Sequence, residues 1–409
     1  MAHARSTPPR VLVIAPTPFF ADRGCHVRIY EEVRLLQQLG MQVEVCTYHL
    51  GRDPEGIPTH RSLRVPWYHK LGPGPSWHKP YLDLLLLARA VSVARRFRPA
   101  VVHGHLHEGA LIGALVAKVF RVPCIADYQG SLTREMASYG FGERLGLRRR
   151  LFGWVERVVN RLPDRIVACT TEVQRDLIER FGVPPGRTTV VADGVGQGLF
   201  REPDSGARRA LGIPDGQRVI VFLGVLTAVQ GIDILIESMT RVLQERPDTH
   251  LLVAGFPGER ERAAEMERHG LGSRATFLGR VPYLDVPGVL AAADLAVTPK
   301  VSTTEGNGKL FNYMACALPV VAFDNPVNRA ILGDDGLYVQ KQSADGFAEG
   351  VLEALDRPPD ALEALGRRLQ ARARAEHSWV RNRLPLAKVY RELLGRRRSG
   401  GCRSSSTSG

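Results

Sequence analysis

A polar loop and the helix start that follows it carry the residues best suited to bind a charged ligand. The segment Thr298–Asp324 reads TPKVSTTEGNGKLFNYMACALPVVAFD, with Glu305 in the loop and Gly308 and Lys309 at the predicted helix start. A glycine-containing turn before a helix presents unpaired backbone N–H groups and the positive end of the helix dipole, which attract phosphate. Asn312 follows Glu305 by seven positions (312 − 305), about two helical turns, so one ligand could contact both. The alternative is an ordinary strand–loop–helix connection with a solvated acid.

Three histidines alternate in the sequence VVHGHLHEG, at the end of another apolar run. On an extended chain His103, His105 and His107 would point the same way. Three such side chains could bind zinc, but no acidic or cysteine ligand is spaced with them, so we expect no metal. The alternative is that they are structural histidines at a strand end.

The composition is that of a globular protein, with 409 residues, 44% of them hydrophobic and 24% charged. This length is too great for one compact core, so two domains are expected. The net charge of +13 favours phosphates, acidic lipid surfaces or nucleic acid as partners. No two of the six cysteines are spaced as a CxxC pair, and most of the six lie in apolar runs. No signal peptide or bilayer-spanning run is recognisable, so we expect a cytoplasmic protein that touches a membrane, if at all, from the inner face.

Strands and helices alternate along both halves of the chain, which predicts parallel sheets covered by helices on both faces. We expect two doubly wound, Rossmann-like domains that face each other across a cleft, with ligands outside the carboxyl ends of the strands. The domains are placed at 10–200 and 201–375, followed by a helix at 376–394 and a disordered, basic Ser/Gly-rich tail at 395–409. Strands are expected at Val11–Ala15, Val43–Thr47, Leu63–Val65, Ala100–His103, Cys124–Ala126, Arg165–Ala168, Thr189–Val191, Val219–Leu223, His250–Ala254, Ala275–Leu278, Leu295–Val297 and Val320–Ala322. After Tyr338 the chain is expected to be helical to Leu394.

Two common nucleotide-binding signatures are absent. No GxGxxG follows any predicted strand, which excludes a standard NAD site. The GNGK of Gly306–Lys309 lacks the glycine that a Walker P-loop has five residues before Gly308, where Thr303 stands, and Leu310 follows the lysine. The chain is therefore neither a standard dinucleotide-binding protein nor a P-loop protein.

Several longer sequence motifs are similar to those of a known protein family. The run MACALPVVA begins within the segment Glu305–Val321 and ends at Ala322. FLGRVP lies within Thr276–Asp294, AAADLAV begins there and ends at Val297, and Asp193–Val195 forms a DGV turn. Together with Ser378-Trp379 and Tyr390 near the C-terminus, these motifs resemble those of the GT-B glycosyltransferases of family 4, which are also called the glycosyltransferases group 1. The resemblance covers nearly the whole chain, and it implies that the 376–394 helix crosses back to the first domain.

Three departures from this family concern the donor-phosphate site. The family usually has an arginine and a lysine on the donor diphosphate where this chain has Val225 and Gln230. The second glutamate of the family's acidic pair is Asn312, whose amide can still hydrogen-bond a diol but carries no charge. Lys309 would supply a cation close to the two that are missing.

The resemblance also assigns roles to residues. It places a catalytic-site histidine at His105, with His107 as the next candidate, and assigns the sugar hydroxyls and the charge at the anomeric carbon to Glu305. Asp127 and Gln129 follow the next strand and are candidate acceptor contacts. The candidate donor-binding residues are Gly24, Gly224, Gln230, Gly308, Lys309 and Asn312.

The activity implied is transfer of a sugar, with retention of anomeric configuration, from a nucleotide-sugar donor to a hydroxyl acceptor. The acceptor is unknown: a glycan, a lipid-linked sugar or a small metabolite. Neither a metal, another cofactor nor nucleic acid is expected to take part. Val225 and Gln230 leave open a catalytically weakened, glycosyltransferase-like binding protein. A GT-B sugar-nucleotide epimerase is the remaining alternative.

The segment Arg144–Leu162 predicts an amphipathic helix. One stripe of this helix is apolar and is surrounded by five arginines, as in a helix that rests on an anionic bilayer. The alternative is a helix packed on the first sheet, which the strand–helix alternation already requires. The stripe comprises Leu147, Leu151, Trp154, Val155, Val158 and Leu162, and the arginines are Arg148, Arg149, Arg150, Arg157 and Arg161.

Overall fold

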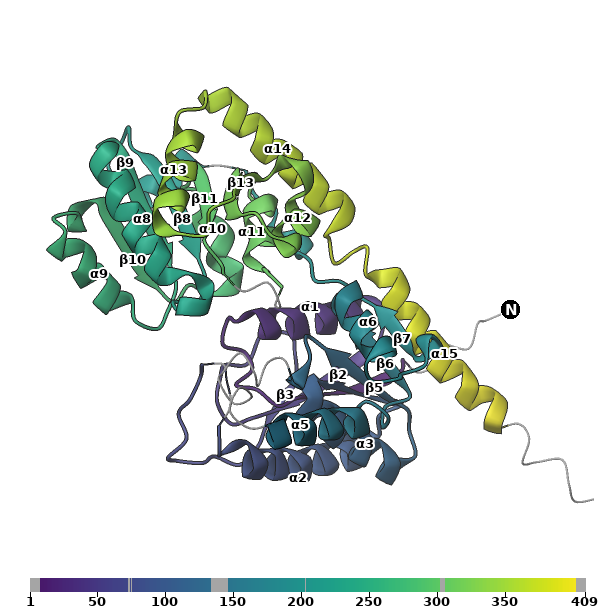
Figure 1. Cartoon of the computed structure of the whole chain (residues 1–409). Coiled ribbons are helices and arrows are strands. Elements are labelled where there is room, and N and C mark those ends of the chain that lie inside the picture. The colour runs from purple at the N-terminus through teal and green to yellow at the C-terminus, as the bar shows by residue number, and fades with distance from the viewer. Residues whose placement is uncertain are drawn as a thin grey trace, which may run out of the picture. The chain divides into compact units, whose positions relative to one another are not determined.

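The computed structural model describes residues 8–72, 74, 76–133, 146–202, 204–301 and 306–401. The chain divides into two compact units, drawn in Figure 1. The first comprises the described parts of Met1–Ala21, Cys25–Asp193 and Asn382–Gly409. The second comprises Asp22–Gly24 and the described parts of Gly194–Arg381. The first unit therefore includes residues from both ends of the chain.

A parallel sheet forms the centre of the first unit, with the described strands in the order β3-β2-β1-β4-β5-β6-β7. The central strand β1 is an apolar run after its first residue because helices cover both faces of such a sheet. The strands are β1 (Arg10–Ala15), β2 (Gln42–Thr47), β3 (Thr59–Arg61), β4 (Val101–His105), β5 (Cys124–Tyr128), β6 (Arg165–Ala168) and β7 (Thr188–Val190). The described helices are α1 (Gly24–Gln38), α2 (Lys79–Phe97), α3 (Leu106–Phe120), α5 (Gly146–Val159), α6 (Thr171–Glu179) and α15 (Arg383–Gly401).

The second unit is built around another parallel sheet, whose described strands have the order β10-β9-β8-β11-β12-β13. Two doubly wound parallel sheets, as predicted, are thus confirmed. The strands are β8 (Arg218–Leu223), β9 (Thr249–Ala254), β10 (Ala275–Gly279), β11 (Leu295–Thr298), β12 (Val320–Phe323) and β13 (Leu337–Val339). The described helices are α7 (Ser205–Ala210), α8 (Ile232–Glu245), α9 (Glu259–Arg268), α10 (Val286–Leu290), α11 (Lys309–Ala315), α12 (Pro326–Leu332), α13 (Ala344–Leu355) and α14 (Pro359–Glu376).

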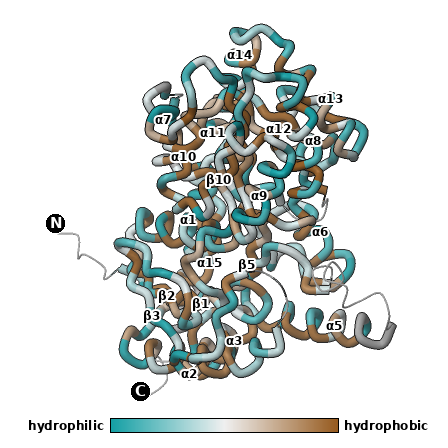
Figure 2. Tube along the Cα trace, turned by 90° about the vertical axis from the view of Figure 1, so that its left-hand side faces the viewer, coloured by the Kyte–Doolittle hydropathy of each residue, from teal (hydrophilic) through white to brown (hydrophobic). Residues whose placement is uncertain are grey.

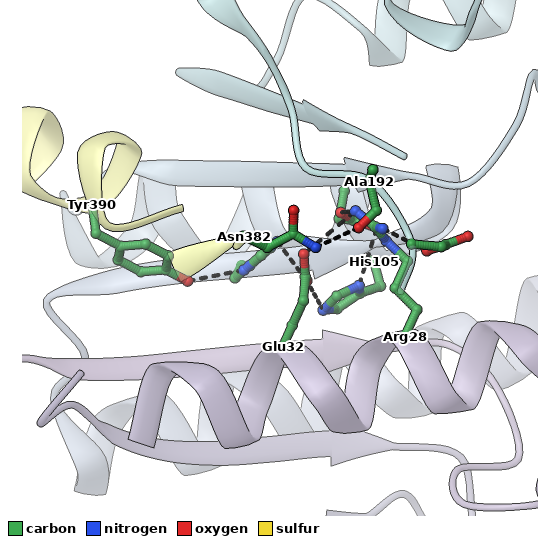
Figure 3. Close-up of polar contacts among 9 residues, drawn as sticks. Arg28, Glu32, His105, Ala192, Asn382 and Tyr390 are labelled. Atoms are coloured by element: carbon green, nitrogen blue, oxygen red, sulfur yellow. Dashed lines mark hydrogen bonds and ion pairs between the residues drawn. The ribbon is translucent and has the colours of Figure 1, made fainter. Parts of the chain in front are cut away.

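Polar contacts attach the C-terminal segment to the rest of the first unit, among them an ion pair between Arg165 and Glu392 and the two hydrogen bonds drawn in Figure 3. The Asn382 side chain donates a hydrogen bond of 2.6 Å to the backbone oxygen of Ala192. On α15, the Tyr390 hydroxyl shares a hydrogen bond of 2.9 Å with Nδ1 of His103 in β4. Tyr390 and His103 are both fully buried, so α15 contributes to the interior of this unit.

Two predicted elements were wrong, and one strand was not predicted. The third strand of the first sheet is Thr59–Arg61, not Leu63–Val65, because the polar residues pair with β2 while Leu63 is 73% exposed. The strand β13 was missed because Leu337–Val339 offers only three residues and no clear alternation. The tail predicted to be disordered from residue 395 is helical to Gly401, and residues 402–409 lie outside the described residues.

Candidate functional site

A buried arginine organises the polar interior of the first unit (Figure 3). Arg28 in α1 donates hydrogen bonds from Nε and Nη2 to the two oxygens of Asp127, at 2.9 and 2.6 Å. Its Nη1 donates to Oδ1 of Asp193 at 2.7 Å. Burial lowers the pKa of Arg28, but the charges of Asp127, Glu32 and Asp193 outweigh this effect and raise it well above its usual value. Arg28 is therefore a permanent cation at the end of β5.

The second acid in this interior, Glu32, follows Arg28 by one helical turn. Its Oε1 lies 3.4 Å from Nη2 of Arg28, and its Oε2 lies 3.6 Å from Nε2 of His105. Burial, and then the negative charge of Asp127, raise the pKa of Glu32 well above its usual value. Asp127 differs because Arg28, by charge and by hydrogen bonds, overcomes the effect of burial and lowers its pKa. The two carboxyl groups beside Arg28 therefore have pKa values shifted in opposite directions.

The histidines of β4 face this acidic group. The rings of His103 and His105 are stacked with their centres 4.6 Å apart, and both side chains are fully buried. The strand register pairs His105 with Asp127, and the two side chains approach to 3.5 Å. Burial, and then the neighbouring His105, lower the pKa of His103 well below its usual value, so His103 is neutral.

His107 does not join the other two histidines. Leu106 has a positive φ of 62° and begins α3, so the alternation of the strand ends before His107. The His107 ring is stacked on Tyr128 at 4.3 Å, and its Nε2 lies 3.5 Å from Glu156 of α5. The expectation that all three histidines point the same way was therefore wrong.

Four residues of the first unit could in principle hold a metal ion. One ligand atom from each of Glu32, His103, His105 and Asp127 lies within 4.8 Å of the others. Arg28 already places a positive charge there, because it donates to both oxygens of Asp127 and contacts Glu32. A divalent ion beside this guanidinium would be repelled strongly in a buried, low-dielectric setting. The guanidinium of Arg28 is therefore itself the cation that these acidic groups hold.

The second unit buries the predicted phosphate ligand Lys309 among apolar groups. Its Nζ lies 4.2 Å from the centre of the Phe222 ring, and the residue is only 9% exposed. Within the described part of the chain, this Nζ has no hydrogen-bond partner. Burial, and then the charge of Lys300, lower the pKa of Lys309 well below its usual value. A buried ammonium without a partner is costly, and a bound anion would relieve that cost.

Gly224 lies directly beside this ammonium. Its φ of +144° favours glycine, and a Cβ at this position would lie 3.0 Å from Nζ of Lys309. The structure thus brings together two predicted donor-binding residues, one after β8 and one at the start of α11. The hydroxyl of Tyr313 holds the same two elements together, since it accepts a hydrogen bond of 2.7 Å from the backbone N–H of Leu223.

The other predicted site residues are spread over several elements. Gly24 is the first residue of α1 and Gly308 immediately precedes α11; neither has an atom within 4 Å of an added Cβ. Gln230 and Asn312 are half-buried. The side-chain nitrogen of Gln129 is buried and has no partner among the described residues. Glu305 lies outside the described residues.

The sequence alone did not identify three buried charged residues, two beside Asp127 in the first unit and one near Lys309 in the second. Arg28 and Glu32 occupy the same face of α1 as the buried Ile29 and Val33, and charged residues four apart on an apolar face are the signal that could have revealed them. Lys300 lies two residues after β11, at the end of a parallel strand, where ligands bind in such sheets.

Comparison with known proteins identifies the class. Residues 23–194 match the family "Glycosyl transferase 4-like domain", and residues 217–357 match "Glycosyl transferases group 1". A D-inositol 3-phosphate glycosyltransferase of Geodermatophilus obscurus is 30% identical over 389 residues, which cover 90% of this chain and 84% of the relative.

Two solved structures share the fold. Sucrose-phosphate synthase from Thermosynechococcus elongatus matches with a TM-score of 0.75 and 20% identity, covering 95% of this chain and 99% of that one. Anabaena Alr3699/HepE in complex with UDP-glucose matches with a TM-score of 0.73 and 17% identity, covering 94% and 99%. Fold and matches together define a glycosyltransferase of the GT-B class. Within that class the chain belongs to family 4, the glycosyl transferases group 1.

Proposed function

We propose that this glycosyltransferase takes its sugar from a nucleotide-sugar donor and transfers it to an acceptor hydroxyl with retention of anomeric configuration. The observation that carries the proposal is the buried ammonium of Lys309 beside Gly224, which has no hydrogen-bond partner among the residues that the structure describes. Glycosyl transfer from such a donor releases a diphosphate, whose negative charge grows in the transition state. A cation held ready in an apolar setting stabilises that charge more than it stabilises the neutral parts of the donor.

The structural neighbour Anabaena Alr3699/HepE was solved with UDP-glucose, which supports a donor of this chemical class. The donor residues retain their predicted roles: Gly308 and Lys309 at the diphosphate, and Asn312 at ribose hydroxyls. Gly24, Gly224 and Gln230 complete the predicted donor set. Val225 leaves the first loop of this unit without the usual arginine, so Lys309 carries more of the charge stabilisation.

Within the proposal, Glu305 keeps its predicted catalytic role and the role of His105 changes. Glu305 would hold the sugar hydroxyls and stabilise positive charge at the anomeric carbon. His105 is fully buried, which supports a positioning role for its side chain at the end of β4 rather than direct contact with the sugar. Asp127 is also fully buried and both its oxygens accept from Arg28, which supports a positioning role rather than the predicted acceptor contact. His107 and Gln129 remain candidates for the catalytic and acceptor contacts. No metal is required, because cationic side chains supply the electrostatic stabilisation.

The acceptor is proposed only as a class, a molecule with a free hydroxyl. The relative from Geodermatophilus obscurus is named for D-inositol 3-phosphate, so a phosphorylated cyclitol belongs among the acceptors to be tested, together with glycans and lipid-linked sugars.

Donor selection followed by product analysis tests this function. A thermal-shift screen of UDP, GDP and ADP sugars selects the donor, and NMR of the product made with each acceptor class gives its anomeric configuration. We expect a product with the configuration of the donor, and no product from Glu305→Ala. An inverted product would refute retention, and full turnover by Glu305→Ala would remove that residue from the site.

A catalytically silent binding protein is the second candidate, favoured by Val225 and Gln230 in place of the usual cations. It predicts binding of the donor without transfer to any acceptor and without hydrolysis. Isotope exchange within the sugar nucleotide, in the absence of acceptor, would instead reveal an epimerase.

We further propose that α5 contacts an anionic membrane surface. This helix packs on the sheet through Val155 and Val159, so its inner face belongs to the core. Its outer face remains apolar: Trp154 is 61% exposed, and brown segments mark apolar residues along α5 in Figure 2. Leu151, Val158 and Leu162 are also exposed, as are Leu111, Leu115 and Val119 of α3, which contacts α5. Among the described residues no helix is long and apolar enough to cross a bilayer.

Exposed arginines border this apolar surface and suit anionic lipid headgroups. We expect the protein to co-sediment with phosphatidylglycerol vesicles at low salt and to dissociate as salt rises. Changing Arg150, Arg157 and Arg161 together to serine should abolish co-sedimentation without lowering the Tm. The matched control changes three exposed arginines of the second unit, Arg260, Arg268 and Arg357, to serine. Equal loss in both triple variants would indicate non-specific charge attraction, and no sedimentation of the wild type would refute the membrane contact.

A further inference from the structure

Glu156 of α5 is a buried carboxylate that lies outside the predicted site. It is only 1% exposed, and glutamate is almost never buried to this extent unless it is paired. Its Oε2 accepts hydrogen bonds from Oγ of Ser131 at 3.2 Å, from the backbone N–H of Thr133 at 2.9 Å and from the Thr133 hydroxyl. Its Oε1 lies 3.5 Å from Nε2 of His107. One carboxylate therefore faces both the loop after β5 and the first turn of α3.

The ring of His107 is held by two contacts. It lies flat on Tyr128, with ring centres 4.3 Å apart and planes inclined by 9°. Tyr128 is fully buried, so it fixes the plane of the His107 ring. Glu156 selects the orientation of the ring within that plane, because only one orientation directs Nε2 at Oε1. Such hydrogen bonds are often long in a free enzyme and tighten when the substrate binds.

The charge on Glu156 suits this task. Burial raises the pKa of Glu156, but the contacts of its carboxylate with His107 and Thr133 outweigh this effect and lower the pKa to about 2. The ionised carboxylate only accepts hydrogen bonds, so Nε2 of His107 must carry the hydrogen that faces it. Nδ1 is then the nitrogen of His107 that is left for a ligand.

We infer that Glu156 is a positioning residue for the acceptor side of the reaction, where it holds the His107 ring and the loop after β5 in one arrangement. The inference rests on the proposed function, in which His107 and Gln129 are candidate contacts. Gln129 lies in the same loop, and its side-chain nitrogen is buried without a partner among the described residues. Fixing both contacts matters because a misplacement of about 1 Å can cost about 100-fold in rate.

A glutamine at position 156 can serve only one of the two elements. Its amide has one oxygen that accepts and one NH₂ group that donates. The donors of Ser131 and Thr133 require the oxygen, so the NH₂ group would face His107. Nε2 of His107 must then accept a hydrogen bond, which moves its own hydrogen to Nδ1. Glu156→Gln thus changes the tautomer of His107 and leaves a side chain of the same size in the interior.

Kinetics and NMR on this variant test the inference. We expect Glu156→Gln to lower kcat by about 10- to 100-fold. The Kd of the donor should stay unchanged, because every predicted donor residue belongs to the second unit. In protein labelled with ¹⁵N-histidine, Nε2 of His107 should be protonated in the wild type, and Nδ1 should be protonated in Glu156→Gln. His107→Asn assigns the signals, and Glu172→Gln, an exposed glutamate of the same unit, should change neither kcat nor tautomer.

A double-variant cycle separates positioning from a merely structural role. If Glu156 acts through His107, combining Glu156→Gln with His107→Asn should lower kcat no further than His107→Asn does by itself. Additive losses would overturn the inference, because a structural glutamate predicts them. An unchanged His107 tautomer in Glu156→Gln would overturn it as well.

The outcomes also distinguish this inference from the proposed function. A wild type that transfers sugar, with full kcat retained in Glu156→Gln or in His107→Asn, would overturn the role of Glu156 and leave the function intact. A wild type that transfers sugar to none of the acceptor classes would refute the proposed function, and the role of Glu156 in the reaction would fail with it.

Discussion

Replacing Lys309 by methionine should stabilise the second unit while it weakens the donor site. The ammonium is buried and has no hydrogen-bond partner among the described residues, and an unsatisfied buried polar group costs about 1–3 kcal/mol. Methionine has a similar length and no charge, so it can fill the same space against Phe222. We therefore expect the free energy of unfolding to rise by about 1–3 kcal/mol at pH 7, or roughly 2–10 °C in Tm for a unit of this size. The diphosphate should bind about 10- to 150-fold more weakly.

The pH dependence of this stabilisation has a defined sign. The pKa of Lys309 is lower in the folded than in the unfolded chain, so the folded chain binds fewer protons between those two values. Stability of the wild type therefore rises with pH up to about 10.4, the usual pKa of lysine, and the advantage of Lys309→Met shrinks over the same window. Calorimetry at several pH values measures both effects, with Lys341→Met as the exposed control. Destabilisation by Lys309→Met would refute the reasoning, because it would mean that the ammonium has a stabilising partner in the free protein.

Three further predictions concern the buried charges of both units. A bound anion should raise the pKa of Lys309, so donor affinity should fall as pH rises through the lowered pKa of the free protein. Titration calorimetry in buffers of different ionisation heat should show proton uptake in that pH window, and proton release there would contradict this. Arg28→Met should destabilise the first unit by about 3–5 kcal/mol in denaturant titrations, because it leaves Asp127 buried without its cation, and adding Asp127→Asn should recover part of the loss. Because the pKa of Glu32 is raised in the folded chain, the folded chain binds more protons than the unfolded chain, and the stability that this group contributes falls as pH rises from about 4.3 towards the raised pKa. Glu32→Gln should therefore be tolerated at pH 7 and should flatten this dependence of stability on pH. A loss of several kcal/mol in the free energy of unfolding would show instead that Glu32 is ionised.

Much of the framework could be predicted from the sequence because it is encoded locally. Buried parallel strands are continuous apolar runs, as in β1 and β8, and glycine or proline marks their ends. Short polar strands carry no such signal, which is why β3 was misplaced. The position of Lys309 at a helix start was also readable, since helix starts have a local pattern.

The sequence by itself therefore determined two doubly wound domains, the family pattern and the lysine at the start of α11. Only the tertiary structure decided which charged groups lie in the interior. Arg28 meets Asp127 and Asp193, which are 99 and 165 positions away along the chain. The physical reason is that the energy of a charge depends on its distance to other charges and to water, and folding sets those distances between segments that the sequence keeps apart.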